Sequence, residues 1–224
     1  MNNSYNPLPF LLENIGVLLS LAVQHLLLSI ISMAVAIVLA VPLGAYVGHL
    51  HRFSFLAING GNVLRALPTL ALAALLITFV GFGFLNIVIC LVVLAFPLIL
   101  TNAYTAVEGV NPGIVEAARG MGMTDGQILF RVELPNALPL IMTGVRTAWV
   151  YVVATAYLAV FAGSPGTLGD IIGNSSGYGI SGIVAASLVA IVLALGGSAV
   201  LGVLERGITP RGLTVARGAA LATA

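Results

Sequence analysis

The stretch FLNIVICLVVLAFPLILTNAY, residues 84–104, decides the fold class of this chain. It contains no charged side chain, and it has the length of about 20 mostly apolar residues that a helix needs to cross a bilayer. Its apolar residues are continuous, whereas the strands of an outer-membrane barrel alternate apolar and polar residues. The stretch therefore predicts a transmembrane helix, in which Pro97 marks a kink.

Outward from this stretch, the charges of the chain separate further apolar runs. Hydrophobic residues make up 60% of the 224 residues and charged residues only 7%, against roughly a quarter charged in a soluble domain. The predicted spans are 24–48, 58–82, 84–104, 138–161 and 183–204. We therefore expect an all-α membrane protein of about five transmembrane helices, forming a single domain over residues 1–224. The stretch Leu8 to Leu21 is either an interfacial helix or an extension of the first span.

The arginines predict the orientation of these spans. Every basic residue is an arginine, and the segments 1–23 and 163–182 contain none. Six of the eight lie in the alternate segments 49–57, 105–137 and 205–224, namely Arg52, Arg119, Arg131, Arg206, Arg211 and Arg217. Because cytoplasmic segments near helix ends are enriched in basic residues, we expect the N-terminus outside and the C-terminus in the cytoplasm. Arg65 and Arg146, close to span ends, are expected to reach the headgroups or the polar segment.

Several classes of protein are excluded by what the chain lacks. Without a lysine it has no Walker A loop, so it is not a P-loop ATPase. An intramembrane protease needs paired catalytic residues inside the bilayer, and Asp125 and Asp170 both lie outside the predicted spans. An ion-driven carrier would show an acidic residue inside a span, and a channel would show a selectivity filter. The sequence predicts neither. The histidines are expected at membrane interfaces, not around a metal ion: His25, His49 and His51.

The polar stretch NPGIVEAARGMGMTDGQILFRVELPNALP, residues 111–139, predicts two short helices joined by a turn. Asn111 is an N-cap residue and Pro112 suits the first helical position, so the first helix is expected to run to about Arg119. Gly120 and Gly122 permit the positive φ angles of a helix end.

The second short helix is predicted from a capping box. Thr124 and Gln127 have the spacing in which each side chain bonds the other residue's backbone. The residue before a proline disfavours helical backbone, so this helix is expected to stop before Leu134–Pro135. Ala117 and Ala118 are expected to face outward, where small side chains let a partner come close.

The spacing of residues in this stretch resembles the EAA signature of ABC importer permeases. Glu116-Ala117-Ala118, three residues, Gly122, nine residues, Val132, one residue and Leu134-Pro135 match it, with Val132 where isoleucine is commoner. The resemblance implies the type I ABC importer permease fold and a cytoplasmic EAA coupling segment, residues 111–137, that docks on a nucleotide-binding subunit. The residues that it assigns to coupling are Glu116, Ala117, Ala118, Gly120, Gly122, Leu134 and Pro135.

That resemblance also implies a set of partners. Two cytoplasmic ATP-binding subunits would hold ATP and Mg, so no cofactor is expected on this chain, which is a transport subunit and not an enzyme. An extracytoplasmic solute-binding protein and membrane lipid are further expected partners, and nucleic acid is not. Five spans are too few to enclose a pore, so a second copy or a related permease is expected. The expected location is the bacterial inner membrane.

Further stretches resemble one branch of these permeases, the osmoprotectant importers for glycine betaine, carnitine or choline. RALPTLAL at 65–72, GVRTA at 144–148 and AGSPGTLGDII at 162–172 carry this likeness, with Ser164-Pro165 where small residues are usual. Methionine-type permeases share the size and the EAA segment, so an amino acid such as methionine is the alternative solute.

The solute path is expected to use aromatic residues, because quaternary ammonium groups bind aromatic faces by cation–π attraction. Aromatic residues also form interface belts and fill cores, so each position has this alternative. Asp170 is expected to cap the short helix after it, with a pairing to the binding protein as the alternative. The candidate lining residues are Phe96, Tyr104, Trp149, Tyr151 and Tyr157.

Overall fold

The computed structural model describes residues 6–51 and 54–209. Every regular element in these residues is helical. In chain order they are α1 Pro7–Glu13, α2 Ile15–Leu50, α3 Ser54–Ala66, α4 Thr69–Val80, α5 Phe84–Glu108, α6 Pro112–Gly120, α7 Asp125–Ile128, the π-helix η2 Leu129–Glu133, α8 Leu134–Thr155, the 3₁₀ helix η3 Ala156–Val160, α9 Gly169–Gly173 and α10 Ser175–Ile208. The all-α prediction is confirmed.

Four continuous helical stretches in the described residues are long and apolar enough to cross a membrane. They are Ile15–Leu50, Phe84–Glu108, Asp125–Val160 and Ser175–Ile208. A fifth span results if Asn59–Ala66 and Thr69–Val80, bent by 86°, count as one. This agrees with about five spans, but the second was expected to be continuous over 58–82. It breaks at Leu67, because the following Pro68 disfavours helical backbone there.

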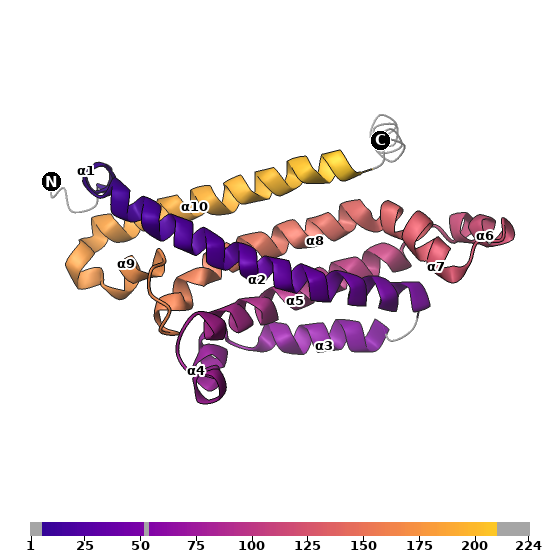
Figure 1. The fold of residues 1–224 in the computed structure, drawn as a ribbon, viewed down its shortest axis with the longest axis horizontal. Helices are drawn as coiled ribbons and strands as arrows, with labels where there is room; N and C mark the ends of the chain where they lie inside the picture. Colours follow the sequence, from indigo (N-terminus) through magenta and orange to yellow (C-terminus); the bar gives the residue numbers. More distant parts are fainter. Residues whose placement is uncertain (1–5, 52–53, 210–224) are drawn as a thin grey trace.

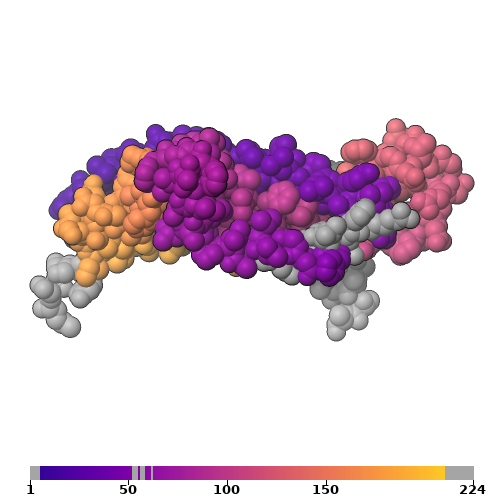
Figure 2. Space-filling model, turned by 90° about the horizontal axis from the view of Figure 1, so that it is seen from below, coloured from indigo at the N-terminus to yellow at the C-terminus, as the bar shows by residue number. Residues whose placement is uncertain are grey.

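The broken span is tied back to the bundle by polar and backbone contacts. The buried Asn86 of α5 donates from Nδ2 to the carbonyl oxygens of Ala73 at 3.1 Å and Gly81 at 3.0 Å. The amide of Gly83 donates to the carbonyl oxygen of Ala162 at 2.8 Å. α4 nevertheless stands out from the molecule (Figures 1 and 2).

The core lies around α5, which packs between α2 and α8. Small residues at every fourth position of α2, from Ala36 and Ala40 to Gly44 and Gly48, are all buried against it. A Cβ on Gly44 would lie 2.7 Å from the carbonyl oxygen of Leu100, so this face admits only glycine there. Stripes of small residues at this spacing let membrane helices approach closely.

α2 is longer than the first predicted span, because it begins at Ile15 and not near residue 24. The stretch Leu8 to Leu21 divides between the separate helix α1 and the first turns of α2. His25 is therefore not interfacial: it is fully buried, and its Nε2 donates to the carbonyl oxygen of Val153 at 2.9 Å. Val153 lies in the last turn of α8, where carbonyl groups lack partners within the helix. His25 has the polarity of a residue at a membrane boundary, but it joins α2 to α8 inside the bundle.

The loop before α9 corrects the expected role of Asp170. This residue stands inside the first turn of α9, whose N-cap is Leu168 without a side-chain bond. Its Oδ2 instead accepts from the backbone amide of Gly166 at 2.6 Å. Asp170 thus fixes the preceding glycine-bearing turn, in which Gly166 has a φ of 96°.

Candidate functional site: the coupling segment

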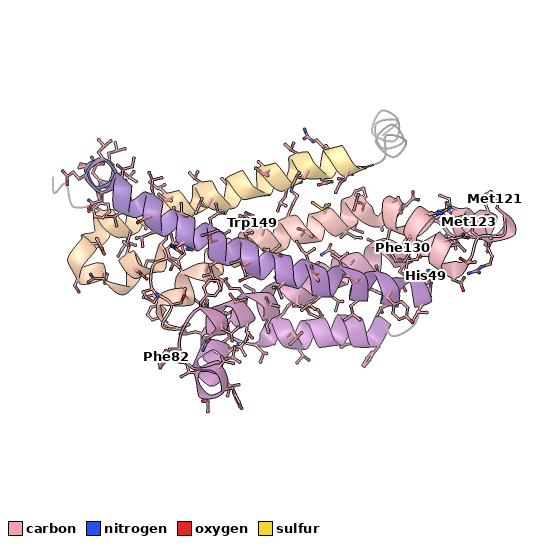
Figure 3. The ribbon with its side chains drawn as sticks, in the orientation of Figure 1. His49, Phe82, Met121, Met123, Phe130 and Trp149 are labelled. Atoms are coloured by element: carbon pink, nitrogen blue, oxygen red, sulfur yellow. The ribbon has the colours of Figure 1, made fainter. Side chains whose placement is uncertain are left out.

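The polar segment between α5 and α8 forms one end of the molecule. Figure 1 shows α6 and α7 at this end and α1 and α9 at the other, with the long helices running between them. Figure 3 places Met121 and Met123 at the tip, beyond the end of α2 at His49. This end contains the coupling segment, residues 111–137.

The two short helices begin as their sequence predicts. Asn111 Oδ1 accepts from the amide of Gly113 at 2.8 Å, and Pro112 follows the cap. At the second helix, the amide of Gln127 donates to Thr124 Oγ1 at 3.4 Å, and Gln127 Oε1 accepts from the amide of Thr124 at 2.9 Å. The capping box is therefore confirmed.

The turn between the helices depends on one glycine, not on two. Gly122 has a φ of 80°, as predicted, whereas Gly120 is the last residue of α6 and has no positive φ. An exposed ion pair spans the turn, with Arg119 Nη2 and Asp125 Oδ1 3.4 Å apart. Exposed pairs of this kind add at most about 1 kcal/mol, so Gly122 sets the shape of the turn.

The two alanines of the EAA motif face in different directions. Ala117 is exposed with Glu116, but Ala118 is only 2% exposed. The expectation that both face outward is wrong, because consecutive residues of a helix lie about 100° apart around its axis. Ala118 packs inside the segment, while Glu116 and Ala117 remain on its surface.

The apolar tip of the segment was missed by the sequence analysis. Met121 is 75% exposed and Ile114 46% exposed, both on or next to α6. These two side chains place exposed apolar surface on an otherwise polar segment, and methionine adapts readily to the shape of what it packs against. The sequence signal for this exposed position was a large apolar residue, Met121, between the two glycines of a polar turn.

The second helix does not end before Leu134–Pro135. α7, η2, α8 and η3 form one continuous helical stretch from Asp125 to Val160. Its π-helical turn absorbs the proline, with the amide of Leu134 donating to the carbonyl oxygen of Leu129. Leu134 packs against the apolar cluster at the ends of α2, α5 and α8 that lie nearest the coupling segment. Leu134 and Pro135 are half-buried and anchor the segment; they do not lie at its tip.

A buried pair joins the coupling segment to α2. Nδ1 of His49 and Oε2 of Glu133 are 2.6 Å apart, with side-chain exposures of 13% and 1%. The interfacial assignment of His49 stays a prediction, and its ring supplies the hydrogen-bond partner that the buried side chain of Glu133 needs. The third histidine, His51, is exposed and bonds the carbonyl oxygen of His49.

The five candidate lining aromatics are not brought together. Tyr104 is buried, and Phe96 and Trp149 belong to the core around α5. Tyr157 donates to the carbonyl oxygen of Ala186 at 2.7 Å and lies edge-on against the ring of His25. Tyr151 alone among the five is exposed, at 53%. The lining assignment stays a prediction: Tyr104 and Trp149 are enclosed between helices of this chain, and Phe96 is half-buried beside them.

Tyr151 belongs to a polar face of α8 that the sequence did not single out. Thr147 and Thr143 precede it by about one and two helical turns, and all three residues are exposed. With Ser198 of α10 they line a cavity of about 450 Å³. The hydroxyl groups of Thr143 and Thr147 donate to the carbonyl oxygens of Pro139 and Thr143 at 3.0 and 2.9 Å.

Arg65 and Arg146 make contacts with other helices. Arg65 donates to the carbonyl oxygen of Pro97 at 3.1 Å, which joins α3 to α5. Arg146 of α8 pairs with Glu205 of α10 at 3.4 Å. Arg52, Arg211 and Arg217, on which the orientation partly depends, lie outside the described residues.

The long apolar helices and the capped pair α6–α7 at one end define a multi-pass membrane permease. The chain belongs to the family of binding-protein-dependent transport system inner membrane components, which matches residues 37–211. It is therefore a permease subunit of a transport system and a multi-pass protein of the inner membrane.

Curated relatives cover nearly the whole chain. The glycine betaine/carnitine/choline transport system permease protein OpuCB of Bacillus subtilis (strain 168) is 36% identical over 91% of this chain and 94% of its own length. The carnitine transport permease protein OpuCB of Listeria monocytogenes is 37% identical over 93% and 95%. The osmoprotectant import permease protein OsmW of Salmonella typhimurium is 32% identical over 91% and 97%.

Solved structures share the fold. A chain of the MetNI methionine ABC transporter, in an inward-facing conformation, gives a TM-score of 0.77 at 21% identity and covers 88% of this chain and 99% of that one. A chain of an amino acid ABC transporter with histidines gives 0.69 at 18% identity, with coverage of 92% and 99%. The expected type I ABC importer permease fold is confirmed.

Proposed function

We propose that this chain is the membrane subunit of an ATP-driven importer for osmoprotectants such as glycine betaine, carnitine, choline or proline betaine. The names of the relatives from three bacteria support this solute class. The whole chain, residues 1–224, acts as one permease domain. ATP and Mg are bound by a separate ATPase subunit, because this chain has no lysine for a phosphate-binding loop.

The observation that carries the ATPase contact is the exposed apolar tip around Met121 on short, rigidly capped helices. ATP binding changes the permease only if the ATPase subunit binds its two conformations with different affinity. Glu116, Ala117 and Gly120 lie on the surface of the coupling segment and contact the ATPase, while Gly122 shapes the turn. Ala118, Leu134 and Pro135 hold the segment in place from inside.

The solute path lies along the polar face of α8, lined by Thr143, Thr147 and Tyr151. This face is exposed in one chain, so a second permease chain, identical or related, closes the path around it. The face carries one aromatic ring, Tyr151, and no carboxylate. A single cation–π contact of about 0.5–2 kcal/mol holds a quaternary ammonium weakly enough to release it.

The proposed orientation puts the coupling segment in the cytoplasm and the end with α1 and α9 outside. The exposed Arg119 and Arg131 of the coupling segment agree with the enrichment of basic residues in cytoplasmic segments. An extracytoplasmic binding protein delivers the solute to the α1–α9 end.

The test uses the complex of this chain with its ATPase subunit and its binding protein, reconstituted in liposomes. ATPase activity is measured without solute and with glycine betaine, carnitine, choline or methionine on the binding protein. The same measurement is made for Glu116→Lys with Gly122→Asp, after checking that the variant permease reaches the membrane. Stimulation by osmoprotectants that the double variant abolishes supports the proposal.

Two results would contradict different parts of it. Unchanged stimulation in the double variant would show that the coupling segment is wrongly assigned. Stimulation by methionine and by none of the quaternary amines would leave the ABC permease role in place and overturn the solute class.

A further inference from the structure

The only short polar contact that joins the coupling segment to α2 in the described residues is between His49 and Glu133. The two residues are 84 positions apart, and their side chains meet at 2.6 Å. Glu133 is the last residue of η2 and His49 lies in the last turn of α2. Figure 3 shows His49 where α2 reaches the coupling segment.

Two cavities flank this pair. A cavity of about 450 Å³ lies on one side, between the ends of α2 and α5 and the helix α6, and both members of the pair line it. A second cavity, of about 640 Å³, lies between α2 and the helices α7 and η2, and His49 lines this one too. Apolar packing also joins these elements, because Leu129 and Leu134 pack against the cluster that contains Ala45 of α2. The pair adds the one short polar contact between them in the described part of the chain.

Both helices are irregular close to the pair. Pro42, two turns before His49, interrupts the hydrogen bonding of α2. η2 is a π-helical turn, a feature that is rare and is found mostly at functional sites. The pair therefore lies close to an irregularity in the hydrogen bonding of each helix, while both helices remain continuous.

We propose that His49 and Glu133 are positioning residues that make the coupling segment and α2 move as one body. This inference rests on the proposed function, since it supposes that an ATPase subunit displaces α6 and α7. The displacement of η2 then reaches α2 through the pair, and α2 carries it along the bundle toward α1. A buried polar pair of this kind can often be replaced by apolar residues of similar size without loss of stability, so the pair's contribution is a defined connection and not stability.

The experiment compares four variants in the reconstituted complex: His49→Leu, Glu133→Leu, the exchange His49→Glu with Glu133→His, and Glu205→Gln. The measured quantity is the stimulation of ATPase activity by glycine betaine on the binding protein, with copurification of the ATPase subunit as the assembly check. Each single leucine variant is expected to lose stimulation about tenfold, within the usual range of coupling between sites. The exchange restores it, because the connection is rebuilt with the residues reversed.

Glu205→Gln is the matched control, since it removes the ion pair with Arg146 between α8 and α10 without touching the coupling segment. It keeps wild-type stimulation. Leucine variants that assemble and keep full stimulation would overturn the inference, as would an exchange variant that assembles and stays as inactive as the single variants. Absence of stimulation in the wild-type complex would instead overturn the proposed function.

A distance measurement decides the matter if the leucine variants do not assemble. Spin labels on Leu50→Cys and Phe130→Cys, both exposed, in a Cys90→Ala background report the separation of α2 and η2. This distance is expected to change by less than about 2 Å, an ordinary helix shift, between the nucleotide-free and ATP-bound complexes. The distance between labels on Phe130→Cys and Val203→Cys changes by more. A Leu50 to Phe130 distance that changes as much as the second one would contradict a single moving body.

Discussion

The indole ring of Trp149 lies against Gly197, so closely that a Cβ on the glycine would be 2.3 Å from the ring. The same ring donates its N–H to the carbonyl oxygen of Ala194 at 3.1 Å. α10 is otherwise the least buried of the long helices. Trp149, labelled in Figure 3, therefore both packs on α10 and donates a hydrogen bond to its backbone.

Gly197→Ala is expected to weaken this contact. The added methyl group overlaps a rigid ring that cannot move aside, and overpacking of this kind costs about 1–3 kcal/mol. The measurement is the thermal unfolding midpoint of the purified permease in detergent, which should fall. The neighbouring Gly196→Ala is the control, because a Cβ there has nothing within 4 Å. Equal midpoints for both variants would show that the ring does not fix the helix contact.

The spans and the helix caps could be predicted because their causes are local. A run such as residues 84–104 must cross the bilayer whatever surrounds it, and Asn111 and Thr124 bond to amides two and three residues away. The polar positions within the spans could not be predicted in this way. His25 has the polarity of a membrane boundary, and only its bond to Val153, 128 positions away, makes it a buried residue.

The coupling segment was predicted in position but not in detail. Leu134–Pro135 has the sequence of a helix end, yet the π-turn beside it lets the helix continue, and this depends on the packing of Leu134 between other helices. Trp149 was expected in the solute path because of its type. The glycine on which it packs comes from another helix, and no local pattern connects the two.

Gly44→Leu is expected to destabilise the contact between α2 and α5. A side chain at this position meets the backbone oxygen of Leu100 at 2.7 Å, and backbone cannot rotate out of the way. The permease should show a lower unfolding midpoint and a lower yield in the membrane. Gly16→Leu, on the same helix with nothing within 4 Å of its Cβ, should behave as wild type. Loss of stability in both variants would indicate a general effect of leucine on α2.

Gly122→Ala tests whether the shape of the turn matters for coupling. The φ of 80° is left-handed, and an alanine there costs about 1–2 kcal/mol, so the turn between α6 and α7 shifts. Stimulated ATPase activity of the reconstituted complex should fall several-fold, while the unfolding midpoint of the bundle changes little. Gly126→Ala is the control, because its φ is not positive and its Cβ would have nothing within 4 Å. Equal stimulation in the two variants would show that the shape of the turn does not affect coupling.

The polar face of α8 is expected to be wet in the assembled transporter. Thr147 is exposed in the middle of a membrane span, and a hydroxyl there is tolerated where it faces a water-filled path. In a Cys90→Ala background, Thr147→Cys should therefore react with a membrane-impermeant thiol reagent that enters from one side. Val38→Cys on α2 should not react, because Val38, which is 69% exposed in the isolated chain, is expected to face lipid, where a thiol does not ionise. If both cysteines react at the same rate, exposure alone governs labelling and the path does not follow α8. If neither reacts in any nucleotide state, the face of α8 is covered by protein, and the polar residues serve contact between the two permease chains.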